Sequence, residues 1–111
     1  MIQPTLQRIE RRQANRYLVQ MPVVWENMVE EHTATISDIS TTGCFVLCNG
    51  PVSRGESIRL RITNSKGKSM LLWSEVVSYV REVGFAVSFV ETSREERLFL
   101  QEFMAHLKKV M

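Results

Sequence analysis

The sequence predicts a mainly β fold, in which about six antiparallel strands form a closed or nearly closed barrel and one helix follows. Three observations predict it: apolar, β-branched runs recur along the chain, turn signals separate them, and the apolar spacing becomes helical near residue 92. A closed barrel also leaves no exposed sheet edge. The expected strands span residues 17–25, 32–39, 44–48, 58–62, 69–80 and 84–90.

The first two strands differ in pattern. The first is apolar almost throughout, and Pro22 within it favours an edge or bulged position because proline cannot donate to a ladder. The second alternates Ala34 and Ile36 with threonine and serine, which is typical of a half-buried strand. Polar residues 26–31 form the turn between them.

The middle of the chain contains the clearest half-buried strand. Residues 58–62 alternate isoleucine and leucine with Arg59 and Arg61. The preceding residues 49–56 combine several turn signals and are expected to form a loop, and the residues Asn64–Gly67 suit a hairpin turn.

A helix is expected over residues 93–110. Thr92 and Ser93 are each followed three residues later by a glutamate, so both are candidates for a capping box at its start. Apolar residues at helical spacing predict one buried face, which is core packing and no cofactor site. These residues are Leu100, Phe103, Met104, Leu107 and Met111.

Length and composition suit one globular domain of 111 residues, with a net charge of +2. No apolar run is long enough to span a membrane and no signal peptide is evident, so a cytoplasmic protein without membrane insertion is expected. Cys44 and Cys48 match neither a redox nor a zinc motif, and they are predicted to be packing residues. Trp25 and Trp73 lie in apolar strands and are also predicted to belong to the core.

Sequence motifs of enzymes are absent. The chain has no glycine-rich phosphate loop, no HExxH and no nucleophile elbow, and its two histidines lie far apart in the sequence. We therefore expect neither catalysis, nor a metal, nor a cofactor. A small net charge and the lack of an outward aromatic ladder also argue against binding of DNA or RNA.

Two short motifs carry the functional prediction. Arg12 and Arg16 form RxxxR just before the first strand, and Asp38, Ser40 and Gly43 form DxSxxG at a turn between strands. Each motif alone is weak, because basic segments and polar turns are common. In this order and spacing, together on an all-β chain, they resemble the PilZ domain family of bacterial receptors for cyclic di-GMP.

The resemblance covers most of the chain, including residues 83–89, which look like the last strand of the family. It implies a six-stranded antiparallel PilZ-type β-barrel with a C-terminal α-helix: a flexible N-terminal arm over residues 1–16, then a barrel domain over residues 17–111. Ala86 is a departure, since many members carry a glycine there.

The chemistry of the motif residues fits such a ligand. The guanidinium of arginine makes bidentate bonds with phosphate oxygens and with the O6 and N7 atoms of guanine. A carboxylate is a natural acceptor for the N1–H and N2–H₂ donors on the opposite edge of guanine. The resemblance implies a ligand site made of Arg12, Arg16, Asp38, Ser40 and Gly43, with Arg11 as an additional candidate for stacking or phosphate contact.

Simpler interpretations of the same residues stay open. The arginines suit a solvated tail, and Asp38 and Ser40 are both common turn-capping residues. As a whole, the chain is expected to bind cyclic di-GMP as a stand-alone receptor, monomeric or weakly dimeric, whose arm closes on the ligand and alters binding to an unidentified protein effector. Alternatives are a PilZ-fold protein-interaction module that binds no nucleotide, and a small barrel that binds nucleic acid.

Overall fold

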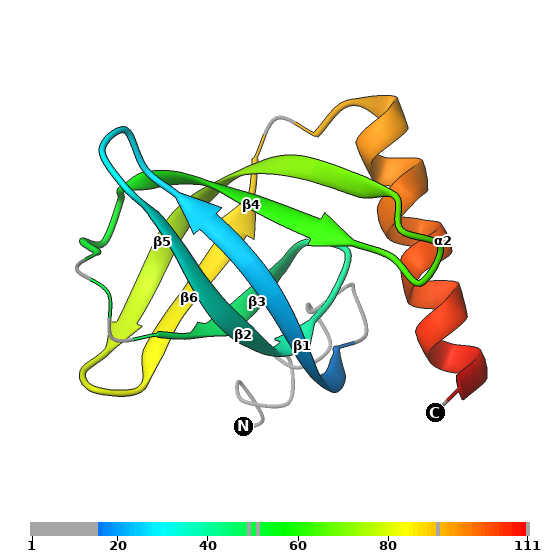
Figure 1. Ribbon diagram of the computed structural model, residues 1–111, viewed down its shortest axis with the longest axis horizontal. Coiled ribbons are helices and arrows are strands. Elements are labelled where there is room, and N and C mark those ends of the chain that lie inside the picture. Colours follow the sequence, from blue (N-terminus) through cyan, green and yellow to red (C-terminus); the bar gives the residue numbers. More distant parts are fainter. Residues whose placement is uncertain (1–15, 49, 51, 91, 111) are drawn as a thin grey trace, which may run out of the picture.

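Six antiparallel strands form a closed barrel, and one helix packs beside it (Figure 1). The computed structural model describes residues 16–48, 50, 52–90 and 92–110. The strands are β1 (Tyr17–Glu26), β2 (Glu31–Ile39), β3 (Gly43–Leu47), β4 (Ser57–Thr63), β5 (Ser69–Val80) and β6 (Gly84–Phe89), and the helix is α2 (Arg94–Val110). The predicted fold class is thereby confirmed.

The strands follow the barrel in the order β1-β2-β3-β6-β5-β4, and β4 pairs with β1 to close it. That last pairing is short, because β1 meets β4 only from Val24 to Glu26. Pro22 lies just before these pairs, opposite Thr35 of β2. The proline therefore occupies the part of β1 that has no partner on the β4 side, in keeping with its missing N–H.

The core fills the barrel with side chains from alternate positions of every strand. Trp25, Ile36, Leu60 and Phe85 are among its largest fully buried members. Cys44 is also buried and Cys48 is half-buried, and both are free thiols, as predicted. Trp73 corrects the prediction that both tryptophans are core residues, because 49% of its surface is exposed and Arg59 lies over its ring at 5.5 Å.

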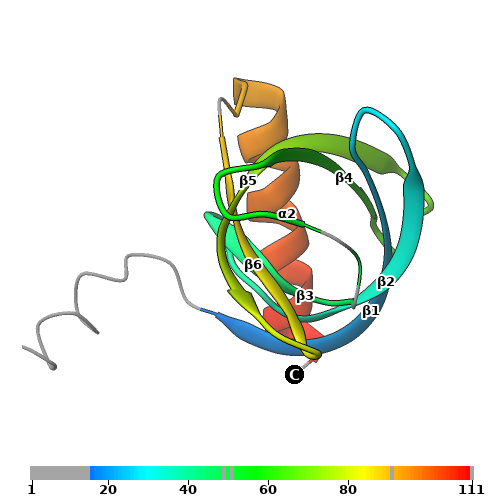
Figure 2. The ribbon, with the colours of Figure 1, turned by 90° about the vertical axis from the view of Figure 1, so that its left-hand side faces the viewer.

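Helix α2 lies at one end of the barrel in Figure 1, and in Figure 2 it is seen behind the ring of strands. Its start is fixed by the capping box that Ser93 predicts: the Ser93 Oγ accepts from the Glu96 N–H at 3.1 Å, and the Glu96 carboxylate accepts from the Ser93 N–H at 2.8 Å. The buried face of α2 includes Phe99 as well as the predicted Leu100, Phe103 and Met104. Within the described ranges, no helix is long and apolar enough to cross a membrane.

Candidate functional site

The pairing of β1 with β2 brings the two motifs together. In this antiparallel ladder Tyr17 lies opposite Ile39 and Leu18 lies opposite Asp38. Arg16, the residue just before β1, is therefore close to Asp38, although 22 positions separate them in the sequence. Its Nη2 donates a hydrogen bond to the Asp38 Oδ1, so the last residue of RxxxR and the first of DxSxxG form an ion pair.

A β-bulge turns Asp38 outward. Strict alternation from the buried Ile36 would place Asp38 inside the barrel and Ile39 outside. The register with β3 instead shifts between Ile36 and Asp38, so that Asp38 pairs with Phe45 and Ile39 with the buried Cys44. The one extra residue in β2 thus exposes the carboxylate and keeps the isoleucine in the core.

A second irregularity lies beside the first. The β1–β2 register shifts between Leu18 and Met21, opposite the same stretch of β2. Asp38 is therefore next to one bulge in its own strand and a second in β1, a position at which barrels often re-aim functional side chains. About 25% of the Asp38 side chain and 34% of the Arg16 side chain are exposed, so both remain accessible to a ligand.

Ser40 is the structural centre of the turn between β2 and β3. It is completely buried, and its Oγ accepts hydrogen bonds from the N–H groups of Thr42 at 3.1 Å and Gly43 at 3.3 Å. The Ser40 N–H donates to the Gly43 carbonyl at 2.8 Å. The hydroxyl thus holds the turn closed, and it has no exposed surface to offer a ligand in this structure.

We expect Ser40→Ala to lower the free energy of unfolding by about 1–2 kcal/mol, because two backbone N–H groups of the turn would lose their acceptor. Urea denaturation of the variant and the wild type measures this difference. Thr41→Ala is a matched control in the same turn and should change stability by less than about 0.5 kcal/mol. A Ser40→Ala protein of full stability would contradict this structural role.

Gly43 is required by the packing of β3 against β6. It pairs with Ser88, and a Cβ atom at this position would lie 2.2 Å from the carbonyl oxygen of Val87. No backbone atom can tolerate such a contact without moving. The turn is also tied to β6 by a hydrogen bond of 2.9 Å from the Phe89 N–H to the Thr42 carbonyl.

The next residue, Cys44, lies on the apolar inner side of the barrel wall, whereas the ion pair lies on its outer side. Its side chain faces the barrel interior beneath the ion pair. Burial raises the pKa of the Cys44 thiol well above its ordinary value, and the nearby Asp38 charge raises it further, while Arg16 acts in the opposite direction. The thiol is therefore neutral and unreactive in the folded protein.

Two of the predicted site residues cannot be placed. Arg11 and Arg12 lie outside the described residues, so their positions stay predictions. In the part of the chain that the structure describes, no group of His, Cys, Asp or Glu could hold a metal ion. The strand register also places Leu18 of β1 and Phe45 of β3 on either side of Asp38, and no local sequence pattern reveals this placement.

Comparison with known proteins identifies a matching family and similar solved structures. The family model of the PilZ domain matches residues 10–106. Among solved structures, the PilZ domain of CeSA from a cellulose-synthesizing bacterium superposes with a TM-score of 0.71 at 14% identity, covering 85% of this chain and 98% of its own. A search of curated proteins finds no match.

Two longer proteins contain the same fold. The Bacillus subtilis inhibitor of motility MotI/DgrA has a TM-score of 0.72 at 19% identity, and Escherichia coli YcgR in complex with cyclic di-GMP has 0.71 at 16%. Each match covers 89% of this chain but only 52% and 46% of those proteins. The chain therefore spans about half their length, and at these identities the likeness shows the fold alone.

Proposed function

Because the chain belongs to the PilZ domain family, we propose that it binds cyclic di-GMP and acts as a stand-alone receptor for it. The observation that carries this proposal is the meeting of Arg16 and Asp38 on the outer wall of the barrel. Together they supply a cation for phosphate or guanine and an acceptor for guanine donors. The structure of YcgR in complex with cyclic di-GMP supports this choice of ligand.

Asp38 has the chemistry to select guanine. Its two carboxylate oxygens can accept from N1–H and N2–H₂ at the same time, whereas adenine presents an acceptor at N1. Arg16 can pair with a phosphate or with the O6 and N7 edge of a base. We assign Arg12 the same kinds of contact, Arg11 an auxiliary contact, and Ser40 and Gly43 the shaping of the turn below the base.

Ligand binding in this proposal is an exchange of partners. Arg16 and Asp38 satisfy each other in this structure. A cyclic dinucleotide brings anionic phosphates for the arginine and N–H donors for the carboxylate in one molecule. It can therefore give Arg16 and Asp38 each a new partner at the same time, so that neither charge is left unpaired.

The proposed signal is closure of the N-terminal arm, residues 1–16. Its arginines would make charge-assisted hydrogen bonds with the ligand and hold the arm against the barrel. The closed arm would present a changed surface to a protein effector in the control of motility, exopolysaccharide, biofilm or virulence. Amide hydrogen exchange of residues 2–16 that saturating ligand leaves unchanged would contradict this step.

Calorimetric titration with cyclic di-GMP tests the binding proposal. We expect saturable binding by the wild type, weakened at least about thirtyfold in Arg12→Ala and in Arg16→Ala, since each loses charge-assisted bonds. Affinity should also fall as salt is raised. GTP, which offers guanine on a different phosphate framework, is the ligand control.

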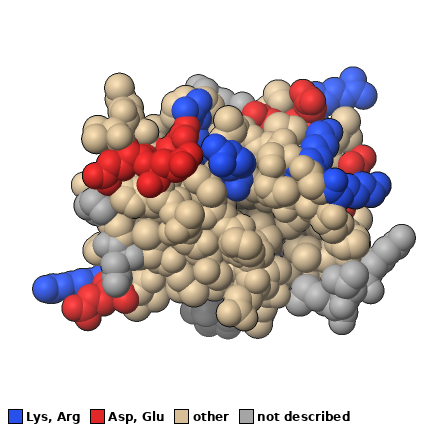
Figure 3. All heavy atoms as spheres, in the orientation of Figure 1, with Lys and Arg blue, Asp and Glu red and all other residues tan. Residues whose placement is uncertain are grey.

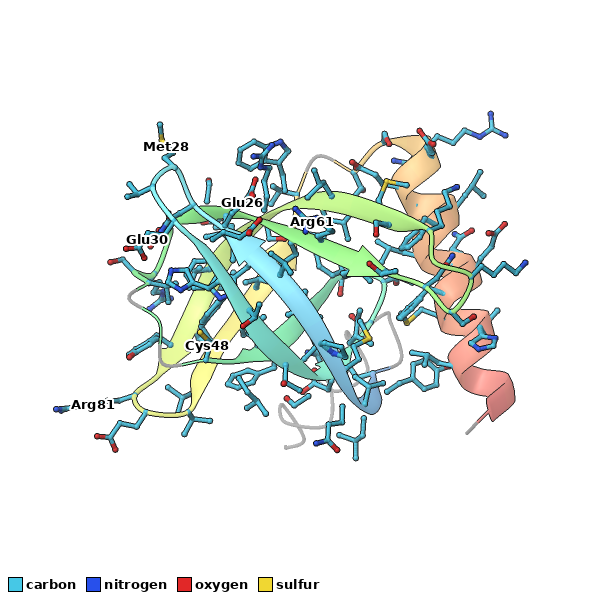
Figure 4. All side chains as sticks on the ribbon, in the orientation of Figure 1. Glu26, Met28, Glu30, Cys48, Arg61 and Arg81 are labelled. Carbon is cyan, nitrogen blue, oxygen red and sulfur yellow. The ribbon has the colours of Figure 1, made fainter. Side chains whose placement is uncertain are left out.

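Arg61→Ala is the matched protein control. Arg61 pairs with Glu31 at 3.4 Å, so it also forms a cross-strand ion pair. Figure 4 shows Arg61 on β4 toward the upper edge of the barrel, whereas β1 begins at the lower end in Figure 1. Its replacement should leave the affinity within about twofold. A folded wild type that binds no cyclic di-GMP by two methods would overturn the proposal and favour a module that binds protein.

A further inference from the structure

We propose that Leu18 and Phe45 are ligand-binding residues that contact the faces of the purine held by Asp38. This inference rests on the proposed binding of cyclic di-GMP and adds two residues that lie outside both sequence motifs. It is carried by the strand register around Asp38, in which an apolar side chain lies directly on each side of the carboxylate.

The three side chains form one outward row across the barrel wall. Leu18 of β1 is opposite Asp38, and Asp38 is opposite Phe45 of β3. Directly opposite residues of antiparallel strands share one face, with Cβ atoms about 4.5–5.5 Å apart. A base that binds the Asp38 carboxylate edge-on is therefore placed where its faces can contact Leu18 and Phe45.

Leu18 is conspicuous for its exposure. About 77% of its surface is accessible, although neighbouring positions of β1 pack against the core. On the one face that Figure 3 draws, the charged side chains gather mainly along the upper edge and at the lower left, and the surface between them is largely uncharged. A base placed against Leu18 would cover apolar surface that water otherwise contacts.

Phe45 is held in a defined position on the wall. Its ring reaches to 3.0 Å from the place that a Cβ atom of Gly84 would occupy, so the absence of a side chain at Gly84 makes room for it. Its neighbour across the β3–β6 ladder is Ala86, whose methyl group covers little of an aromatic ring. The ring is thus half-buried and fixed, which lowers the entropy lost when a base stacks on it.

Asp38 on the one hand, and Leu18 and Phe45 on the other, would contact different parts of the base. A carboxylate accepts hydrogen bonds in the plane of the base, so the faces of that base are left for side chains on either side. Asp38 would then read guanine, while Leu18 and Phe45 would contribute affinity that depends on a flat ring and not on its identity. Stacking of this kind is commonly worth about tenfold in affinity or more.

Substitutions at both positions test the inference by calorimetry with cyclic di-GMP. We expect roughly fivefold weaker binding for Phe45→Leu, which loses the flat ring, and near wild-type binding for Phe45→Tyr, which keeps it. Leu18→Ser should weaken binding roughly threefold. Tyr79→Leu and Leu71→Ser are control variants, because both residues are exposed on β5, which does not pair with β2, and they should have no effect.

Phe45→Trp adds a readout that a purely structural role would not affect. Guanine stacked on the new indole should quench its fluorescence during the titration, beyond any change seen from Trp25 and Trp73 in the wild type. Urea denaturation confirms that each variant is folded. Binding of Phe45→Leu and Leu18→Ser within twofold of wild type, with no added quenching, would overturn the inference and leave the proposed function intact. Failure of the wild type to bind would overturn both.

Discussion

Gly43→Ala is expected to lower the free energy of unfolding by about 3 kcal/mol, because the added methyl group has no room in the sheet. The added carbon would lie 2.2 Å from the Val87 carbonyl oxygen, so β3 and β6 must separate or shift to accept it. Against a typical domain stability of about 5–15 kcal/mol this is a substantial loss. Urea denaturation, together with backbone amide NMR shifts across β3 and β6, measures it.

Gly67→Ala is the matched control for this prediction. Gly67 has a φ of 84° in the β4–β5 turn, and no atom lies within 4 Å of the position that its Cβ would take. Its replacement should cost about 1 kcal/mol through backbone strain alone, with shifts confined to the turn. A Gly43→Ala protein with wild-type stability and lost ligand binding would contradict the packing explanation and place the reason for the glycine in ligand contact.

Asp38→Ala is expected to weaken binding of cyclic di-GMP by about a hundredfold or more while the barrel stays folded. The substitution removes the carboxylate that can pair with both donors on the guanine edge. The partly exposed Arg16–Asp38 ion pair itself should contribute at most about 1 kcal/mol to stability. Calorimetry and urea denaturation on the same samples separate the two effects.

Two further variants sharpen this test. Asp38→Asn keeps one acceptor oxygen and is expected to bind with intermediate affinity. Glu31→Ala removes another acidic residue of β2 that pairs with an arginine, Arg61, and it should leave binding unchanged. Equal affinities of Asp38→Ala and Glu31→Ala would show that Asp38 makes no contact with the ligand.

Much of the fold could be predicted, because its signals are local. Alternation, turn residues and the change to helical spacing located all six strands and the helix, and the capping box at Ser93 fixed the helix start. Trp73 was misplaced for a physical reason. The strand β5 carries apolar residues such as Leu71 and Val77 on its outer face too, so its sequence does not distinguish inside from outside.

The candidate site was predicted only in part, because its geometry depends on strand register. The motifs anticipated that Arg16 and Asp38 belong to one site, and the ladder between β1 and β2 places them in contact. The roles of Ser40 and Gly43 in closing the turn depend on where β6 runs, which no local pattern reveals. The bulge had one visible signal: the buried Ile36 and Ile39 are three residues apart, where a regular strand would space them by two.

The ion pair between Arg16 and Asp38 also has a consequence for which small molecules can occupy this surface. Because the two side chains bind each other, a ligand must displace Arg16 to reach Asp38 and displace Asp38 to reach Arg16. An abundant nucleotide such as ATP offers phosphates to Arg16 but no matching donors to Asp38, so its binding would leave the carboxylate without its cation. A molecule that brings phosphate to Arg16 and guanine donors to Asp38 at the same time would incur no such loss. The ion pair would therefore disfavour anions that satisfy only one of the two residues.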